Sequence, residues 1–230
     1  MLLAILGYGK MGHAIETLAL QRGHQIGCTV DNDDDWNRCG DALRACDVAV
    51  EFSQPAVAVD NLRRCFDLGL PVVCGTTGWY DRLDAVAAEC RDRGQALLVA
   101  SNFSIGMNIM FELNRRLAQL MAARPEYKVS LSETHHIHKL DAPSGTAITL
   151  ARDINEVCHA ERMPVGDIVS IREGEVPGIH EVVYESDVDT LTLRHSAKSR
   201  QGLALGAVLA AEYLCGRKGF YTMRDLLSEA

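Results

Sequence analysis

The first hundred residues alternate between short apolar runs and longer segments with apolar positions at helical spacing. Continuous apolar runs bounded by turns are typical of strands buried on both faces. The predicted strands cover residues 2–6, 24–30, 48–52, 71–74 and 96–100, and the predicted helices between them cover residues 13–22, a short stretch closing at 43–46, 57–68 and 82–93. This alternation with short turns predicts an α/β fold with a parallel, doubly wound sheet of the Rossmann type.

The pattern changes after residue 104. Alternating apolar and polar residues there are typical of a sheet with one exposed face. The predicted elements are helices at 107–123, 144–158, 204–216 and 221–227, and strands at 127–138, 168–172, 180–186 and 189–195. We therefore expect one domain made of residues 1–106 and 205–230, with an inserted α+β domain made of residues 107–204.

The composition narrows the classes of function. Hydrophobic residues make up 47% and charged residues 23% of the 230 residues, which is ordinary for a soluble globular protein. A net charge of -8 argues against a general binder of nucleic acid or acidic membranes, and no apolar run is long enough to cross a membrane. The eight cysteines are scattered without a CxxC pair, so we expect a reduced, cytoplasmic protein.

A glycine-rich loop follows the first predicted strand and opens a predicted helix. Gly7 permits the tight turn, Gly9 lets the backbone approach a pyrophosphate, and Gly12 allows close packing of helix on sheet. With Lys10 and Met11 between these glycines, the loop is a candidate dinucleotide-binding site.

An acidic residue, Asp31, ends the second predicted strand. A carboxylate there accepts hydrogen bonds from the adenosine ribose hydroxyls and repels a 2′-phosphate. The acidic residues 33–35 add to that repulsion, whereas Arg38 could fold back and offset it. We therefore expect NADH as the preferred cofactor, with NADPH as the alternative.

Two further loops follow predicted strands, at the edge where ligands bind in such sheets. Their small polar residues suit ribose and amide groups, and an aromatic residue suits the nicotinamide ring. Simple turn chemistry is the competing interpretation of each loop. The candidate cofactor-binding residues here are Gly75, Thr76, Thr77, Ser101, Asn102 and Phe103.

The segment 133–147, ETHHIHKLDAPSGTA, concentrates proton donors and cations before a predicted helix start. Ser144 is suited to cap that helix, and the N–H groups of a helix start bind anions. We therefore expect a pocket for a small carboxylated molecule. Histidines two apart on a strand also suit a metal, but no Asp or Cys pattern supports one, so we expect no metal. The candidate substrate and catalytic residues are His135, His136, Lys139, Gly145 and Thr146, whereas His138, His180 and His195 are expected to be structural or ordinary strand residues.

Six motifs occur in an order that resembles the dihydrodipicolinate reductase (4-hydroxy-tetrahydrodipicolinate reductase) family. They are GYGKMG, CGTTGW, SNFSIGMN, ETHHIHKLDAPSGTA, REGEVPGIH and HSAKSRQGLALGA. The resemblance extends from end to end and implies a two-domain, usually tetrameric enzyme. It implies that residues 1–106 and 205–230 form the dinucleotide-binding domain and that residues 107–204 form the substrate-binding and oligomerisation domain. That family uses NADH or NADPH to reduce the dehydrated product of dihydrodipicolinate synthase to tetrahydrodipicolinate, in diaminopimelate and lysine biosynthesis.

The resemblance also implies roles for particular residues. Carried over onto matching positions, His135 is the general acid and Lys139 the essential cation, while His136, Gly145 and Thr146 bind the substrate carboxylates. Some members have an arginine after the acid that ends the second strand, and Asn32 stands there in this chain, which favours NADH. The alternatives are another NAD(P)-dependent dehydrogenase of an amino-acid-like diacid, such as an aspartate dehydrogenase, or a non-catalytic NADH sensor.

Overall fold

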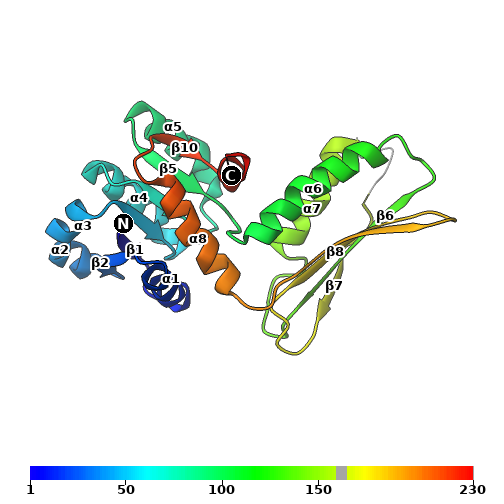
Figure 1. Cartoon of the computed structure of the whole chain (residues 1–230), viewed down its shortest axis with the longest axis horizontal. Helices are drawn as coiled ribbons and strands as arrows, with labels where there is room; N and C mark the ends of the chain where they lie inside the picture. The colour runs from blue at the N-terminus through cyan, green and yellow to red at the C-terminus, as the bar shows by residue number, and fades with distance from the viewer. Residues whose placement is uncertain (159–164, 230) are drawn as a thin grey trace. The chain divides into compact units, whose positions relative to one another are not determined.

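The computed structural model describes residues 1–158 and 165–229, and the chain divides into two compact units. Unit 1 comprises Met1–Ser104 and Gln201–Ala230, and unit 2 comprises Ile105–Arg200 (Figure 1). The chain passes between the units at the beginnings of two helices, a few residues from the boundaries expected from the sequence, which were 1–106 with 205–230 and 107–204.

The sheet of unit 1 contains six strands in the order β10-β5-β4-β3-β1-β2, and every neighbouring pair is parallel. Its strands are β1 (Leu2–Leu6), β2 (Gln25–Val30), β3 (Val48–Glu51), β4 (Val72–Cys74), β5 (Ala96–Val99) and β10 (Gly219–Tyr221). The predicted Rossmann-like, doubly wound parallel sheet is confirmed. The sequence interpretation missed β10, a three-residue edge strand that pairs with β5.

Helices cover both faces of this sheet. Along β1, Ala4 and Leu6 belong to the core formed with α4 and α5, whereas α8 packs against α1 and the central strands. The helices of unit 1 are α1 (Lys10–Gln21), α2 (Asp33–Arg38), α3 (Gly40–Ala45), α4 (Pro55–Leu68), α5 (Leu83–Asp92), α8 (Gln201–Leu214) and α9 (Met223–Ser228), with the 3₁₀ helix η1 (Tyr80–Arg82).

One expected acidic loop in unit 1 is a helix. Residues 32–35 were predicted to form a loop after the second strand, but α2 begins at Asp33. The side chain of Asn32 caps this helix by accepting a hydrogen bond from the backbone N–H of Asp35, at 3.0 Å. Three acids in the first turn favour the helix further, because negative charge is stabilised at a helix N-terminus.

Unit 2 is a four-stranded mixed sheet, ordered β7-β6-β8-β9, with two helices on one face. Strands β6 and β7 are parallel, and the other two pairs are antiparallel. The elements are α6 (Ile105–Met121), β6 (Lys128–His135), α7 (Gly145–Cys158), β7 (Val169–Arg172), β8 (Ile179–Glu185) and β9 (Thr190–Ser196). Figure 1 shows α6 and α7 side by side over the sheet.

Alternation along β6 places two polar side chains in the apolar layer of unit 2. Val129, Leu131, Glu133 and His135 are buried, and the residues between them are more exposed. Because successive side chains of a strand point to opposite faces, Glu133 and His135 share the face that packs on α6 and α7. The strand ends at His135, three residues before the predicted end.

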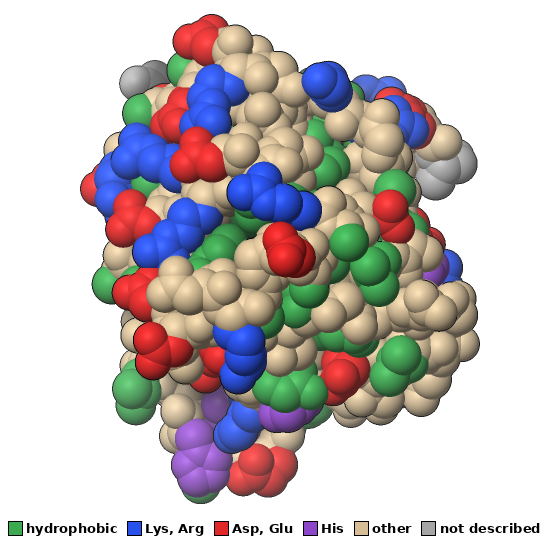
Figure 2. Space-filling model, turned by 90° about the vertical axis from the view of Figure 1, so that its left-hand side faces the viewer, with side chains coloured by type: hydrophobic (Ala, Val, Ile, Leu, Met, Phe, Trp, Pro, Cys, Tyr) green, Lys and Arg blue, Asp and Glu red, His purple; other side chains and the backbone are tan. Residues whose placement is uncertain are grey.

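The surface of the molecule mixes charges of both signs. Exposed ion pairs in unit 1 join Arg64 to Asp33 and Arg93 to Asp67, each at 2.7 Å. Figure 2 shows acidic and basic side chains interspersed on one face of the molecule. Among the helices within the described residues, none has the length and apolar character needed to cross a bilayer.

Candidate active site

The glycine loop between β1 and α1 has the close packing that its spacing predicts. Gly7 has a φ of +90°, and an added Cβ would collide with the backbone carbonyl of Phe52. A Cβ on Gly12 would collide with the carbonyl oxygen of Gly7. By contrast, a Cβ on Gly9 would have no atom within 4 Å. The loop therefore packs tightly at its first and last glycines and is open at the middle one, before the N-terminus of α1.

Asp31 lies at the end of β2, directly beside this loop. Its Oδ1 accepts a hydrogen bond from the backbone N–H of Tyr8, at 2.9 Å, and its side chain is exposed. The guanidinium of Arg38 pairs with Asp35 at 2.7 Å. The cation that could offset the acidic surroundings of Asp31 is thus already bound to a neighbouring carboxylate.

The loops after β4 and β5 hold candidate cofactor residues of two kinds. Thr76 is buried, and its hydroxyl accepts a hydrogen bond from the backbone N–H of Ser53, at 2.8 Å. Phe103 is also buried, with its ring 5.3 Å from that of Phe52. These two side chains therefore hold the loops after β4 and β5 in place by contacts within unit 1. The loop residues left more accessible are Gly75, Thr77, Ser101 and Asn102.

A buried carboxylate that the sequence interpretation missed joins the loop after β3 to the end of β4. Glu51, at the end of β3, is fully buried and accepts hydrogen bonds from the side chains of Ser53, Asn61 and Cys74. Burial and this carboxylate raise the pKa of the Cys74 thiol well above its usual value, so the thiol stays protonated and donates. In the sequence Glu51 falls within an apolar run, which gave no sign of this role.

In unit 2 the histidines of segment 133–147 separate into two environments. His135 closes β6 and is buried, whereas the chain then turns and leaves His138 exposed, 3.2 Å from Glu175. His136 lies in the same turn, where its Nε2 is 3.3 Å from a guanidinium nitrogen of Arg200. Because the strand ends at His135, the three histidines do not follow the alternation that a strand to residue 138 would have imposed.

Lys139 follows in this loop and is paired with a carboxylate. Its Nζ donates to Oδ1 of Asp141 at 2.8 Å and to Oδ2 at 3.0 Å. This pairing holds the pKa of Asp141 below its usual value. The lysine side chain is 23% exposed, so a ligand can reach it.

The start of α7 has the capping geometry predicted for it. Ser144 is buried, and its hydroxyl accepts a hydrogen bond from the backbone N–H of Ala147, at 3.2 Å. Gly145 comes next and is exposed, and a Cβ added there would meet no atom within 4 Å. Thr146 completes the first residues of the helix. An N-terminal helical turn with open space beside it is a general anion-binding geometry.

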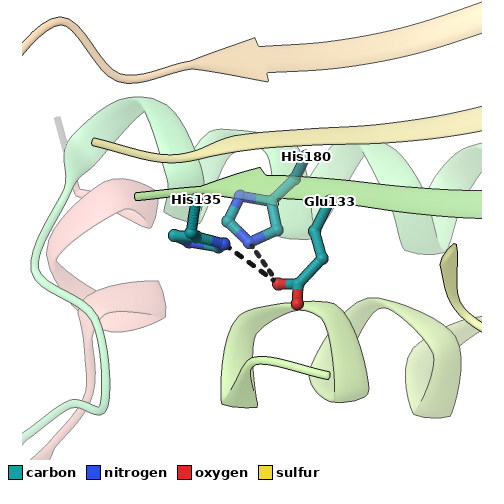
Figure 3. A group of neighbouring side chains, drawn as sticks. All are labelled: Glu133, His135 and His180. Atoms are coloured by element: carbon teal, nitrogen blue, oxygen red, sulfur yellow. Dashed lines mark ion pairs between the residues drawn. The ribbon is translucent and has the colours of Figure 1, made fainter. Parts of the chain in front are cut away.

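Three buried polar side chains meet behind this turn (Figure 3). Oε2 of Glu133 lies 3.3 Å from Nδ1 of His135 and 3.8 Å from Nε2 of His180, on the neighbouring strand β8. The two imidazole rings lie 5.1 Å apart, tilted by 73°. Figure 3 shows both rings turned toward the carboxylate.

The other carboxylate oxygen of Glu133 binds three donors. Oε1 accepts hydrogen bonds from the backbone N–H of Ser144 at 3.0 Å, from the Ser170 hydroxyl at 3.0 Å and from Arg172 at 3.1 Å. Burial raises the pKa of this carboxyl, but the bonds from Ser144 and Arg172 outweigh burial and bring it below its usual value. Glu133 is therefore an anion in the interior of unit 2.

The surroundings of the two histidines disfavour their charged forms. Burial lowers the pKa of His135, and Glu133 opposes that effect, while the nearby cations Lys139 and Arg172 lower the pKa further. Burial lowers the pKa of His180 to about 4. At neutral pH His180 is thus uncharged.

These three side chains are also the group, among the described residues, whose atoms could surround a metal ion. Their ligand atoms all lie within 4.8 Å of one another. However, Arg172 already pairs with Glu133, and Lys139 lies close enough to lower the pKa of His135. A further cation would have to join two existing ones, so the arrangement fits proton chemistry better than metal binding.

The sequence interpretation missed Glu133, Arg172 and His180 as parts of this site. His180 was expected to be an ordinary strand residue, but it is 5% exposed and faces Glu133. A signal existed in β8, where His180, Val182 and Tyr184 alternate as one buried face. Arg172 carried no such signal, because only the parallel pairing of β6 with β7 brings it to Glu133.

Comparison with known proteins gives family matches over almost the whole chain. Residues 1–103 match the family model "Dihydrodipicolinate reductase, N-terminus", and residues 106–227 match "Dihydrodipicolinate reductase, C-terminus". The 4-hydroxy-tetrahydrodipicolinate reductase of Christiangramia forsetii is 45% identical, across 99% of this chain and 98% of that protein. The enzyme of the same name from Akkermansia muciniphila is 37% identical, across 95% and 94%.

A solved structure shares the fold. The dipicolinate-bound dihydrodipicolinate reductase from Paenisporosarcina sp. TG-14 superposes with a TM-score of 0.78 at 20% identity, covering 96% of this chain and 97% of that one. The sequence matches and the shared fold agree from one end of the chain to the other. This chain therefore belongs to the dihydrodipicolinate reductase family.

Proposed function

We propose that this chain catalyses the reduction for which its relatives are named, with unit 1 holding the dinucleotide and unit 2 the dicarboxylate substrate. The reaction uses NAD(P)H and gives tetrahydrodipicolinate in diaminopimelate and lysine biosynthesis. The observation that carries this proposal is the arrangement in unit 2, where Lys139 and the start of α7 accompany the buried His135. A sensor that only binds NADH has no need of such an arrangement.

The substrate would be held by its two carboxylates. The Lys139 ammonium suits one of them, because hydrogen bonds between charged groups are strong. The first turn of α7 at Gly145 and Thr146 suits the other, since a helix N-terminus attracts anions. His136 is the third proposed carboxylate ligand. Two fixed carboxylates leave a planar ring little freedom, so binding at these residues also orients the ring for reaction.

His135 would supply the proton. Bound NAD(P)H supplies a hydride to one ring carbon, and the neighbouring position must then gain a proton. Histidine has an ordinary pKa near neutral pH, which suits a general acid. His135 is buried except for 10% of its side chain, and that exposed part can meet a ligand.

The dinucleotide would occupy unit 1 at the glycine loop. The proposed contacts are Gly7, Gly9, Lys10, Met11 and Gly12 in that loop, Asp31 at the end of β2, and the loop residues Gly75, Thr76, Thr77, Ser101, Asn102 and Phe103. The open space at Gly9 supports a pyrophosphate before α1.

We further propose that NADH is preferred over NADPH. Asp31 is exposed beside the loop, and Asn32 follows it where a cation would be needed for a 2′-phosphate. A phosphate placed there would meet like charge from Asp31 and the first turn of α2. The preference rests on this charge distribution.

We also propose that the chain assembles as a homotetramer. Within the part of unit 2 that the structure describes, one face of the sheet carries no helix, and exposed apolar side chains of β7, Val169 and Ile171, lie on it. Exposed apolar patches of this kind often mark contacts between subunits. Light scattering coupled to gel filtration measures the assembly directly.

The test of the proposed function is oxidation of NADH with the substrate made in the cuvette. Dihydrodipicolinate synthase, pyruvate and aspartate semialdehyde supply it, and the loss of NADH absorbance reports turnover. Loss that requires all three supports the proposed reaction. No loss despite NADH binding, measured by fluorescence with and without 2,6-pyridinedicarboxylate, would contradict it and favour a sensor or another diacid substrate.

A further inference from the structure

Glu133 stands between the proposed proton donor and the proposed anion-binding turn. Its two oxygens have separate neighbours, with Oε1 bound to Ser144 and Arg172 and Oε2 turned toward His135. The side chain is fully buried, so these contacts are closed to bulk solvent. Oε2 makes no hydrogen bond of good geometry, although it lies 3.3 Å from Nδ1 of His135.

We propose that Glu133 is a positioning residue for the reduction, which orients the His135 ring and keeps that histidine able to carry the transferred proton. The proposal rests on the function proposed above and assigns one further residue to it. Glu133 itself would touch neither substrate nor cofactor, because it is closed off behind His135, His180 and the start of α7 (Figure 3).

The orientation argument concerns the two nitrogens of the His135 ring. Nδ1 is fully buried and faces Glu133, so the exposed 10% of the side chain lies elsewhere on the ring. On the opposite edge the ring approaches Gly178 so closely that an added Cβ would lie 3.1 Å from Nε2. The ring of His180 packs against it edge to face. These neighbours hold the ring with Nδ1 toward Glu133 and Nε2 at the edge beside Gly178.

The charge argument concerns what surrounds a protonated His135. The groups that face it are Glu133 on its own strand, Lys139 and His136 in the following loop, Arg172 on β7 and His180 on β8, with His195 on β9 beyond His180. Among these groups Glu133 alone is an anion. Burial and the cations all oppose a proton on His135, and Glu133 is the group that favours it.

The same carboxylate fixes the proton donor relative to the substrate's anion site. Oε1 accepts the backbone N–H of Ser144, the residue that caps α7, and Oε2 contacts the ring that would deliver the proton. The spacing between His135 and the start of α7 is therefore fixed by the side chain of Glu133, which contacts both, rather than by loops. The hydrogen bond from Ser144 to this buried carboxylate is charge-assisted and restricts motion of the two groups it joins.

Glu133→Gln is the informative variant. Glutamine keeps an acceptor oxygen for Ser144, Ser170 and Arg172, and it places an uncharged amide group toward His135. We expect the pKa of His135, followed by NMR of its ring protons in the ligand-free protein and assigned with His135→Gln, to fall by about one unit or more. The upper pH limit of kcat/KM should move down by the same amount, because the general acid loses its proton earlier.

Two further variants separate this role from stability. Asp153→Asn removes another buried carboxylate of unit 2, which pairs with Arg115 at 3.0 Å on the α6–α7 side. We expect it to leave the titration of His135 and the pH profile unchanged. Glu133→Asp retains the negative charge on a shorter side chain, so it should restore part of the wild-type pH profile. NADH affinity should stay within about twofold in all three variants, because the dinucleotide loop lies in unit 1.

Two outcomes would overturn the proposal. One is a Glu133→Gln protein whose His135 titrates as in the wild type. The other is a loss of activity that is equal at every pH and is reproduced by Asp153→Asn, as for a merely structural residue. The NMR titration needs no turnover, so it tests the coupling of Glu133 to His135 even if the wild-type chain does not reduce the proposed substrate. That failure would instead count against the proposed function.

Discussion

Nζ of Lys139 lies 2.8 Å from Oδ1 and 3.0 Å from Oδ2 of Asp141, so the cation proposed to bind substrate is paired before any ligand arrives. Asp141 is 57% exposed, which leaves this ion pair open to competition. Exposed ion pairs contribute little net stability, and a substrate carboxylate can therefore replace Asp141 at small cost.

The first prediction concerns Lys139→Ala. We expect kcat/KM to fall by about 100-fold or more, since a charged hydrogen bond to a substrate carboxylate is lost. The dissociation constant for NADH, measured by fluorescence, should be nearly unchanged because the glycine loop belongs to unit 1. Lys128→Ala, at the exposed beginning of β6, is the matched control and should retain activity. Weakened NADH binding in Lys139→Ala would contradict the division of roles between the units.

The second prediction concerns the competitor, Asp141. Asp141→Asn should tighten the binding of 2,6-pyridinedicarboxylate several-fold, because the ligand no longer displaces a charged group from Lys139. Calorimetric titration of wild type and variant gives the two dissociation constants. Unchanged or weaker binding would mean that Asp141 orients the lysine for the ligand rather than competing with it.

The third prediction concerns cofactor choice. Asp31→Ala should narrow the ratio of kcat/KM for NADH over NADPH, because the variant no longer presents a carboxylate to the adenosine ribose or to a 2′-phosphate. Asp34→Ala, in the first turn of α2, removes a charge nearby without touching the end of β2. If both variants change the ratio equally, the combined negative charge of this acidic segment sets the preference for NADH. In that case a direct contact between Asp31 and the cofactor is not the cause.

The fourth prediction compares two glycines of the same loop. Gly9→Ala should fold with an unchanged melting temperature, because the new Cβ meets no protein atom within 4 Å, yet it should weaken NADH binding by filling space before α1. Gly12→Ala should instead lower the melting temperature, since its Cβ would collide with the carbonyl of Gly7. Normal NADH affinity in Gly9→Ala would show that the pyrophosphate lies elsewhere.

The fifth prediction concerns stability in acid. The pKa of His180 is about 4 in the folded protein, below the ordinary value of 6.5, so the unfolded chain binds this proton more strongly. The contribution of this histidine to the free energy of unfolding is fully present above pH 6.5. As the pH falls from 6.5 toward 4, that free energy decreases by on the order of 3 kcal/mol. Denaturant unfolding of His180→Gln should therefore depend less on pH in this range. The exposed His138→Gln should retain the wild-type dependence.

Local patterns in the sequence predicted much of the fold. Apolar runs and glycine or proline punctuation located the strands and helices of unit 1, since burial on both faces and helix termination are local properties of the chain. The missed strand β10 has only three residues and takes its place by pairing with β5, which no local pattern indicates. The helix α2 was missed because its acidic residues were interpreted as a solvated loop, although Asn32 before them is a typical helix cap.

The candidate site was predictable only where its residues are contiguous. The segment 133–147 showed cations beside a capped helix start, and Ser144 does cap α7. It did not show which histidine is buried, because that depends on β6 ending at His135 rather than at residue 138. One strand end decides whether a side chain enters the core or the solvent.

The sequence by itself determined the family, the order of the elements and the residues available for chemistry, because these are written in short contiguous motifs. Only the tertiary structure decided that Glu133 is a buried anion shared by His135, Arg172 and the start of α7. Its neighbours come from β6, β7, β8 and the turn before α7, segments separated by up to tens of residues. Burial and pairing between such segments set the charge of each group, and these are properties of the packed chain rather than of any local pattern.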